Sequence, residues 1–179
     1  MDLLLTVLFA LTLPWTVIGF LNASIGLLLM RTTSNPEIAV CPVTMPPATV
    51  AIHSSTAIAL CIRNEDVQSV TANLDRMLAG LEAAGVADRF HSYVLSDTDD
   101  EATAAMEAAT FGARSDRGAE RIAVQYRRRL DNVGFKAGNI RDFLSNWGQH
   151  HEFMLVLDAD SVMSAEAILR LVRIMQANP

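Results

Sequence analysis

The feature that most constrains this chain is the stretch of residues 3–30, which has no charged side chain and is interrupted only by Pro14 and a few small polar residues. As an α-helix it would extend roughly 42 Å at about 1.5 Å per residue, more than the ~30 Å hydrocarbon core of a bilayer. A buried core helix of this length would show a polar face, and none is found. The stretch therefore predicts a transmembrane helix, with the lipid bilayer as a partner.

A cleaved signal peptide is the main competing interpretation of residues 3–30. Signal peptides begin with a basic segment, whereas Met1 is followed here by Asp2, and no A-x-A cleavage site follows a short apolar core. Arg31 is the first basic residue after the stretch, which favours a cytoplasmic position for the segment C-terminal to it. Residues 31–55 carry four prolines and show no helical or strand periodicity, so we predict an extended Pro-rich linker.

Composition argues against two classes of partner. The formal net charge of −6 argues against nucleic acid. Cys41 and Cys61 belong to no C-x-x-C or Cys/His cluster, so they predict free thiols in a reducing compartment and no zinc site. The basic run of residues 127–129 has two interpretations, a solvated basic edge or a source of attraction for an anion.

From residue 56 the chain alternates between short apolar runs and amphipathic segments. The apolar runs, typical of buried strands, cover residues 56–62, 90–97, 121–127 and 153–158. The segments with helical spacing cover residues 67–81, 98–109, 136–147 and 164–175. Such alternation predicts an α/β domain over 56–179, with mainly parallel strands and helices on both faces.

Helical spacing also predicts which side chains face the core. In the third helix these are Ile140, Phe143, Leu144 and Trp147, and in the fourth they are Ile168, Leu171, Val172 and Met175. Gly85 and Gly148 are stop signals, and Ser164 is a candidate N-cap.

Polar residues follow each predicted strand at its carboxyl end, the edge where open parallel sheets bind ligands. They are Asn64 and Glu65 after the first strand, Asp97 after the second, Lys136, Gly138 and Asn139 after the third, and Asp158 and Asp160 after the fourth. Their convergence on one edge predicts a binding site there.

Asp158 and Asp160 are spaced so that both carboxylates can face one divalent cation. Mg²⁺ and Mn²⁺ take oxygen ligands and bind through one or two carboxylates together with substrate phosphates. The alternative is that the two acids only form a turn at the end of a strand. The pair is therefore a candidate metal site for Mg²⁺ or Mn²⁺.

The other edge residues suit a nucleotide, although each has a simpler role. Asp97 either accepts hydrogen bonds from a base or ribose or caps the next helix, and residues 99–101 complement that helix dipole. Lys136 stands at a helix start beside Gly138, which would permit close approach of an anionic diphosphate.

Together these pieces resemble the membrane-embedded family 2 glycosyltransferases, on the motifs "NED", "SD", "KAGN" and "LDAD". The longer matches "CIRNEDV", "VLSDTDD", "YRRR", "GNIRDF…WG" and "FMLVLDADSVM" are similar to the subgroup named glucans biosynthesis glucosyltransferase H. The resemblance covers about residues 56–179 and a preceding span.

The resemblance implies a GT-A fold, a nucleotide-binding sandwich, and an inverting glucosyltransferase at the bacterial inner membrane. It would use UDP-glucose to extend a glucan acceptor, the β-glucan backbone of osmoregulated periplasmic glucans, with its catalytic domain in the cytoplasm. Asp97 would contact the uridine, and Lys136 the uracil or diphosphate. Asp158 and Asp160 would hold the metal and sugar-diphosphate, and Asn64, Glu65, Gly138 and Asn139 belong to the same substrate-binding motifs.

The chain also departs from that family. Its general base is an acid in a downstream T-E-D-like motif, followed by Q-x-x-R-W and further spans, and none of these occurs before Pro179. We therefore expect a fragment that holds the donor half of the site and binds UDP-sugar without turnover. The alternatives are another processive synthase, of cellulose, chitin or hyaluronan, and a non-catalytic membrane-tethered remnant. A D-x-D phosphohydrolase fits less well, because no second metal cluster or aspartyl nucleophile motif is found.

Overall fold

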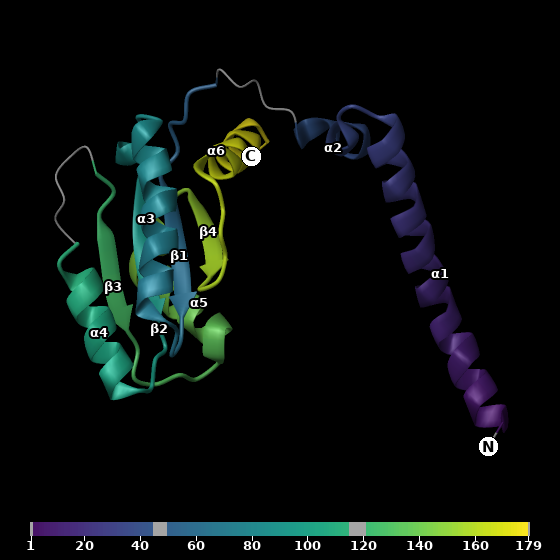
Figure 1. Cartoon of the computed structure of the whole chain (residues 1–179), viewed down its shortest axis with the longest axis horizontal. Helices are drawn as coiled ribbons and strands as arrows, with labels where there is room; N and C mark the ends of the chain where they lie inside the picture. The colour runs from purple at the N-terminus through teal and green to yellow at the C-terminus, as the bar shows by residue number, and fades with distance from the viewer. Residues whose placement is uncertain (1, 45–49, 115–120, 179) are drawn as a thin grey trace. The chain divides into compact units, whose positions relative to one another are not determined.

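The computed structural model describes residues 2–44, 50–114 and 121–178. The chain divides into two compact units, Met1–Pro46 and Pro47–Pro179, and each is described by itself. Figure 1 shows the apolar helix of the first unit and the mixed α/β domain of the second.

The first unit is dominated by α1 (Asp2–Thr32), a single helix that contains Pro14. Within it, Leu3–Thr32 has a mean hydropathy of 2.1 and is not buried inside the protein, so by length and composition it can cross a membrane. Its hydroxyls bond back to carbonyls one turn earlier, as Ser24 Oγ does to Phe20 O at 2.8 Å. Such bonds satisfy polar groups that an apolar surrounding would leave without water.

The predicted linker contains helical turns, so the prediction of an extended segment was wrong for part of it. Two short elements occur, α2 (Pro36–Val40) and η1 (Pro42–Thr44). Pro36 stands at the start of α2, where its fixed φ favours a helix and its missing N–H is not needed. Residues 45–49 lie outside the described part of the chain.

Ordered packing of the second unit begins before the predicted boundary at residue 56. Ile52 is buried in the core. Arg173 Nε donates a hydrogen bond to Val50 O at 2.9 Å, and Gln176 Oε1 accepts one from His53 N at 3.0 Å. The last helix of the chain therefore holds the segment that leads into the first strand.

The second unit is built on a four-stranded sheet in the order β3-β2-β1-β4. All neighbouring pairs are parallel, which confirms the predicted α/β class. The strands are β1 (Thr56–Ile62), β2 (Phe90–Ser96), β3 (Val124–Arg128) and β4 (Phe153–Asp158). In register, Cys61 pairs with Asp158, Ile62 with Ser96, and Ser96 with Arg128. All four strands therefore end at one edge.

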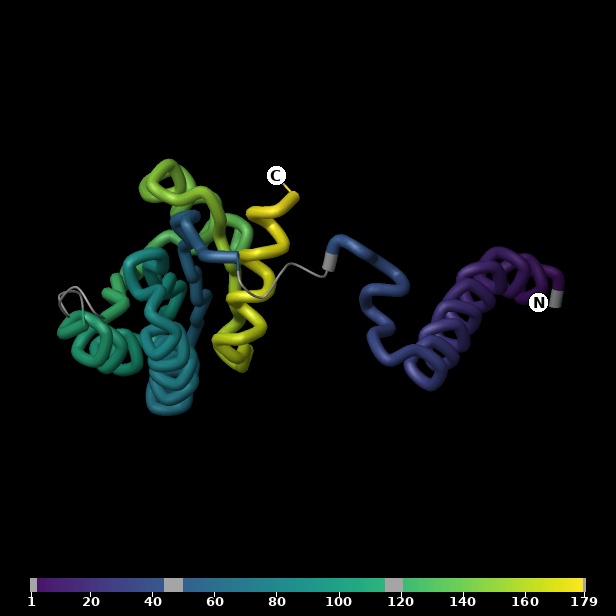
Figure 2. Tube along the Cα trace, turned by 90° about the horizontal axis from the view of Figure 1, so that it is seen from above, coloured from purple at the N-terminus to yellow at the C-terminus, as the bar shows by residue number. Residues whose placement is uncertain are grey.

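Helices cover both faces of the sheet, as predicted, but unequally. One face carries α3 (Val67–Ala83), α4 (Glu101–Gly112) and α6 (Ala165–Ala177), and the other carries α5 (Phe135–Trp147). Figure 2 shows α5 on one side of the strands and the other three helices on the opposite side. The short elements η2 (Ala87–Arg89) and η3 (Gly148–His150) precede β2 and β4.

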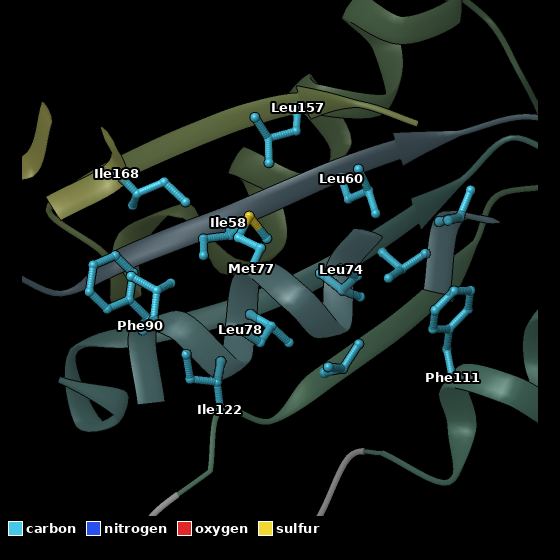
Figure 3. Packing of buried hydrophobic residues seen from close by; sticks show 14 of the residues in the cluster. Ile58, Leu60, Leu74, Met77, Leu78, Phe90, Phe111, Ile122, Leu157 and Ile168 are labelled. Atoms are coloured by element: carbon cyan, nitrogen blue, oxygen red, sulfur yellow. The ribbon is translucent and has the colours of Figure 1, made fainter. Parts of the chain in front are cut away.

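Alternation along β1 sorts its side chains between two cores. Ile58 and Leu60 face the larger core with α3 and α6, which Figure 3 shows in detail. Ala57 and Ala59 face the smaller core, where Phe143 of α5 packs. Because successive side chains of a strand point to opposite faces, this apolar run serves both layers.

The predicted inward faces were only partly right. The six apolar positions expected in α3, from Val67 to Leu81, are all buried. Leu144, Leu171 and Met175, however, are exposed. In α6 the buried stripe instead runs through Ile168, Leu169 and Val172, because one turn of a helix brings positions three and four apart to the same side.

A histidine lies half-buried at the opposite edge of the sheet. His151 Nε2 hydrogen-bonds the Tyr93 hydroxyl at 2.8 Å, and its Nδ1 lies 2.9 Å from Ser55 Oγ. Burial, together with the charges of His91 and His150, lowers the pKa of His151 below its ordinary value of 6.5. The unfolded chain therefore binds a proton at His151 more readily than the folded chain does. The contribution of neutral His151 to the free energy of unfolding is complete above pH 6.5 and is lost as the pH falls below it.

We predict that the free energy of unfolding decreases as the pH is lowered from about 7 to 5, because protonation of His151 opposes its buried site. Substitution His151→Gln should flatten this slope while leaving the curves parallel above pH 7. Denaturant unfolding of the full chain in detergent micelles at several pH values measures both slopes. An unaltered slope in the variant would contradict the assignment.

Candidate functional site

An open cavity of about 380 Å³ lies at the carboxyl edge of the sheet, where the sequence predicts a site. Among the predicted residues, its lining includes Glu65, Asp97, Lys136, Asn139, Asp158 and Asp160. Cys61, Ile62, Arg63, Phe135 and Ala159 complete it. Asn64 and Gly138 are not in the lining. Residues that follow all four strands therefore meet at one edge of the sheet, as the sequence predicts.

Asp97 follows β2 and is only 5% exposed. Its carboxylate accepts two hydrogen bonds from the Arg129 guanidinium, from Nε at 2.9 Å and from Nη2 at 2.7 Å. Its main chain is held as well, since Asp97 N–H donates to Ile62 O at 3.0 Å and Asn132 Nδ2 donates to Asp97 O at 2.8 Å. Asp97 is therefore a rigid, neutralised acid at the wall of the cavity.

Asp97 does not cap the helix that follows it, which was the alternative role predicted for this residue. Asp100 caps α4, where its carboxylate accepts a hydrogen bond from Thr103 N at 2.8 Å. That hydrogen bond lowers the pKa of Asp100. Glu101 stands in the first turn of the same helix, as expected for acids near a helix N-terminus.

The arginine run is not the solvated basic edge that was one of its two interpretations. Each side chain is at most one-fifth exposed and is paired with an acid: Arg127 with Asp142, Arg128 with Glu101, and Arg129 with Asp97. The hydrogen bond that Arg129 donates to Asp97 raises the pKa of Arg129, whereas burial lowers the pKa of Arg127. Because these charges are compensated within the fold, they add little to the attraction for an anion.

Asn64 hydrogen-bonds the loop between β2 and α4 and does not line the cavity. Its backbone has a φ of +55°, and its N–H donates to Thr98 Oγ1 at 2.9 Å. Its side-chain Oδ1 accepts hydrogen bonds from the N–H groups of Asp99 and Asp100, both at 3.2 Å. The structure thus ties the end of β1 to the start of α4 through this asparagine.

Gly138 is required by packing. A Cβ at this position would lie 2.0 Å from Val133 O and 2.9 Å from Arg129 Nη1. The sequence predicted that a diphosphate could approach Gly138 closely. In the structure the loop that contains Val133 occupies the space beside Gly138 instead. The glycine lets the first turn of α5 pack against the Arg129 loop.

Asn139 is the next residue of α5 and is 1% exposed. Its Nδ2 donates to Leu95 O at 3.0 Å, which anchors α5 to β2. Within the described part of the chain, its buried Oδ1 has no hydrogen-bond partner. Asn139 lines the cavity, but this oxygen is itself buried, so a ligand there would reach it only after a movement of the side chain.

Asp158 and Asp160 lie on a turn at the end of β4. Ser161 N–H donates to Asp158 O at 3.0 Å, so the predicted turn forms, while both acids also line the cavity. Ala159 between them packs against the larger core, and this directs the two acids away from it. Lys136 Nζ forms an ion pair with the Asp158 carboxylate, and both side chains remain substantially exposed.

The donor set at this turn fits a divalent cation only in part. The described residues contain no group of three or more His, Cys, Asp or Glu side chains that would hold a metal by itself. Two carboxylates at one cavity are nevertheless the ligands that Mg²⁺ uses when substrate phosphates and waters complete its shell. The residues therefore suit a cation that arrives with an anionic ligand.

Glu107 of α4 is a buried acid that the sequence analysis missed. It is fully buried and accepts hydrogen bonds from Ser96 Oγ at 2.6 Å, Thr98 Oγ1 at 2.6 Å and the Tyr126 hydroxyl at 2.9 Å. Burial, with the negative charge of Glu107, raises the pKa of Tyr126 to about 12. Ser96 and Thr98 flank Asp97, so Glu107 fixes the position of that acid.

A signal for Glu107 was present in the sequence. Ala104, Glu107 and Phe111 recur at helical spacing and are the buried residues of α4. An acid on an inward helical face requires hydrogen-bond donors from other elements. Those donors could not be identified before the strands were placed.

An all-parallel α/β sheet with this edge is consistent with a GT-A-like fold, the class that the resemblance implied. No family model matches the chain. Over 175 residues, 97% of this chain, it is 39% identical to proteins named glucans biosynthesis glucosyltransferase H from Pseudomonas putida (strain W619) and Dickeya dadantii (strain 3937). Over 128 residues, 72% of the chain, it is 45% identical to the protein of that name from Caulobacter vibrioides (strain NA1000 / CB15N).

These matches confirm the resemblance seen in the motifs. The chain is homologous to glucans biosynthesis glucosyltransferase H over nearly its whole length. It spans about a fifth of the length of these curated relatives, covering 20% of the first and 19% of the Caulobacter protein.

We predict that Gly138→Ala destabilises the domain by about 1–3 kcal/mol, because the added methyl group would overlap Val133 O. Gly112→Ala is the matched control, since a Cβ there meets nothing within 4 Å and alanine favours a helix. Denaturant unfolding of both variants measures the difference. Equal stability of the two variants would contradict this prediction and show that the loop at Val133 can move away without cost.

Proposed function

We propose that the α/β domain binds the UDP-glucose donor of a membrane-bound inverting glucosyltransferase of family 2, which extends the β-glucan backbone of osmoregulated periplasmic glucans. The observation that carries the proposal is the single cavity that collects Asp97, Lys136, Asn139, Asp158 and Asp160 from separate chain segments. The names of the homologous proteins support glucan synthesis by glucosyl transfer.

In this proposal Asp158 and Asp160 hold Mg²⁺ or Mn²⁺ together with the donor diphosphate. The cation would supply positive charge that stabilises the departing UDP. Lys136 forms an ion pair with Asp158, and it would turn toward the diphosphate once the cation neutralises that acid. The two exposed partners can exchange in this way at low cost, because an exposed ion pair contributes little by itself.

The nucleoside end of the donor is assigned to the other wall of the cavity. Asp97, which is held by Arg129, and Asn139 both line the cavity there. Hydrogen bonds from the uracil or ribose to these two residues would orient the donor. We assign no general base and no acceptor-binding residue within the described residues.

The apolar helix α1 would anchor the domain at the inner membrane, with the domain on the cytoplasmic side. Its length and mean hydropathy support a membrane span. Arg31 in its last turn supports the cytoplasmic placement of the residues after the helix.

Equilibrium binding of UDP to the full chain in detergent micelles tests the donor site. Wild type should bind UDP more tightly with Mg²⁺ or Mn²⁺ than with a chelator, because the cation joins the diphosphate to the two acids. Asp160→Asn should weaken binding about 10-fold or more in the presence of the cation, and change it little in the chelator. Asp160 is exposed, so the variant should retain its fold.

Asp88→Asn is the matched control, an exposed acid in η2 that does not line the cavity, and it should bind UDP like wild type. Equal UDP affinity with cation and chelator, or in wild type and Asp160→Asn, would reject the donor-site assignment. A panel of UDP-glucose and UDP-N-acetylglucosamine separates glucan synthesis from chitin or hyaluronan synthesis.

A further inference from the structure

Phe135 is an aromatic residue kept in an unfavourable state at the cavity. Its side chain is 70% exposed, so most of its apolar surface contacts water. Its φ is +47°, in the left-handed region that residues with a Cβ rarely occupy. Exposure and backbone strain together are unusual for a phenylalanine, and such strain occurs mainly at functional sites.

The strained backbone of Phe135 is held by bonds to its neighbours. Its N–H donates to Asn132 O at 3.0 Å, and Arg129 Nη2 donates to its carbonyl at 3.1 Å. The same guanidinium binds the Asp97 carboxylate. The preceding Gly134 has a φ of +75°, which turns the chain so that Phe135 can begin α5. Phe135 is therefore fixed relative to Asp97.

The sheet order separates two kinds of chemistry around this ring. Asp97 follows β2 and Phe135 follows β3, which are neighbours at one side of the sheet, whereas Asp158 and Asp160 follow β4 at the other side. Lys136 extends from α5 to Asp158. The cavity thus has an aromatic side chain and the polar residues Asp97 and Asn139 at one end, and the carboxylates of Asp158 and Asp160 at the other.

We infer that Phe135 is a stacking platform for the base of the sugar nucleotide, an inference that rests on the proposed donor site. A nucleotide matches this arrangement, because it has a flat ring with hydrogen-bond donors at one end and a diphosphate at the other. Stacking on an aromatic side chain tolerates any base, whereas the polar side chains of Asp97 and Asn139 would select the groups on its edge. The ring remains exposed because the base covers it only in the complex.

Binding of UDP and of inorganic pyrophosphate to the full chain in micelles, both with Mg²⁺, tests this role. Phe135→Ala should weaken UDP binding by roughly 5- to 150-fold, the range found for loss of one stacked base. Pyrophosphate has no base, so its affinity should stay within about 2-fold. Phe135→Tyr should restore UDP binding. Leu130→Ala is the matched control, since Leu130 is 84% exposed and does not line the cavity.

Phe135→Gly separates stacking from a structural role. Glycine adopts a positive φ without strain, so this variant should unfold at a higher or equal temperature while it binds UDP more weakly. A loss of affinity caused by damaged structure would instead be accompanied by a lower unfolding temperature.

Four results would overturn the inference. Wild-type UDP affinity in Phe135→Ala would reject stacking and leave the proposed donor site intact. An equal loss of UDP and pyrophosphate affinity would show that the residue orders the loop instead. Unaltered UDP binding with weaker association to lipid vesicles would identify Phe135 as a membrane contact. Failure of folded wild type to bind UDP would reject the proposed function itself, and the inference with it.

Discussion

The bidentate ion pair between Asp97 and Arg129 is the interaction on which the rest of the site depends. Asp97 ends β2 and is almost fully buried, and an uncompensated carboxylate there would be strongly unfavourable. Arg129 neutralises it with two hydrogen bonds and uses its remaining N–H groups to hold the carbonyls of Val133 and Phe135. One guanidinium therefore joins the end of β2 to the start of α5.

This pair is supported from the opposite side by Glu107. The hydroxyls of Ser96 and Thr98 donate to its buried carboxylate on either side of Asp97, while Thr98 also accepts from the Asn64 N–H. Rigid groups around a site keep its geometry before the ligand arrives. The acids after β4 differ, because they are exposed and Asp158 is paired with the exposed side chain of Lys136. One wall of the cavity is therefore held by buried, paired groups, and the other consists of exposed side chains that can move.

Much of the fold could be predicted because its signals are local. The apolar runs and helical spacing of this chain predicted all four strands and the four helices of the domain, and the buried face of α3 was predicted residue by residue. Leu144, Leu171 and Met175 were placed incorrectly, because apolar character does not say which side of a helix meets the sheet. The short helix α2 was missed because five residues carry too little periodicity to detect.

The sequence by itself determined which elements form and that their polar ends meet at one edge, since parallel strands with alternating helices leave few other arrangements. Only the tertiary structure decided what each polar residue does there. Arg129 neutralises Asp97, Gly138 makes room for Val133 O, Asn64 braces a loop, and Phe135 lies exposed in the cavity. These roles depend on contacts between residues that are separated along the chain, and hydrogen-bond partners become defined only when the strands and loops are placed in space.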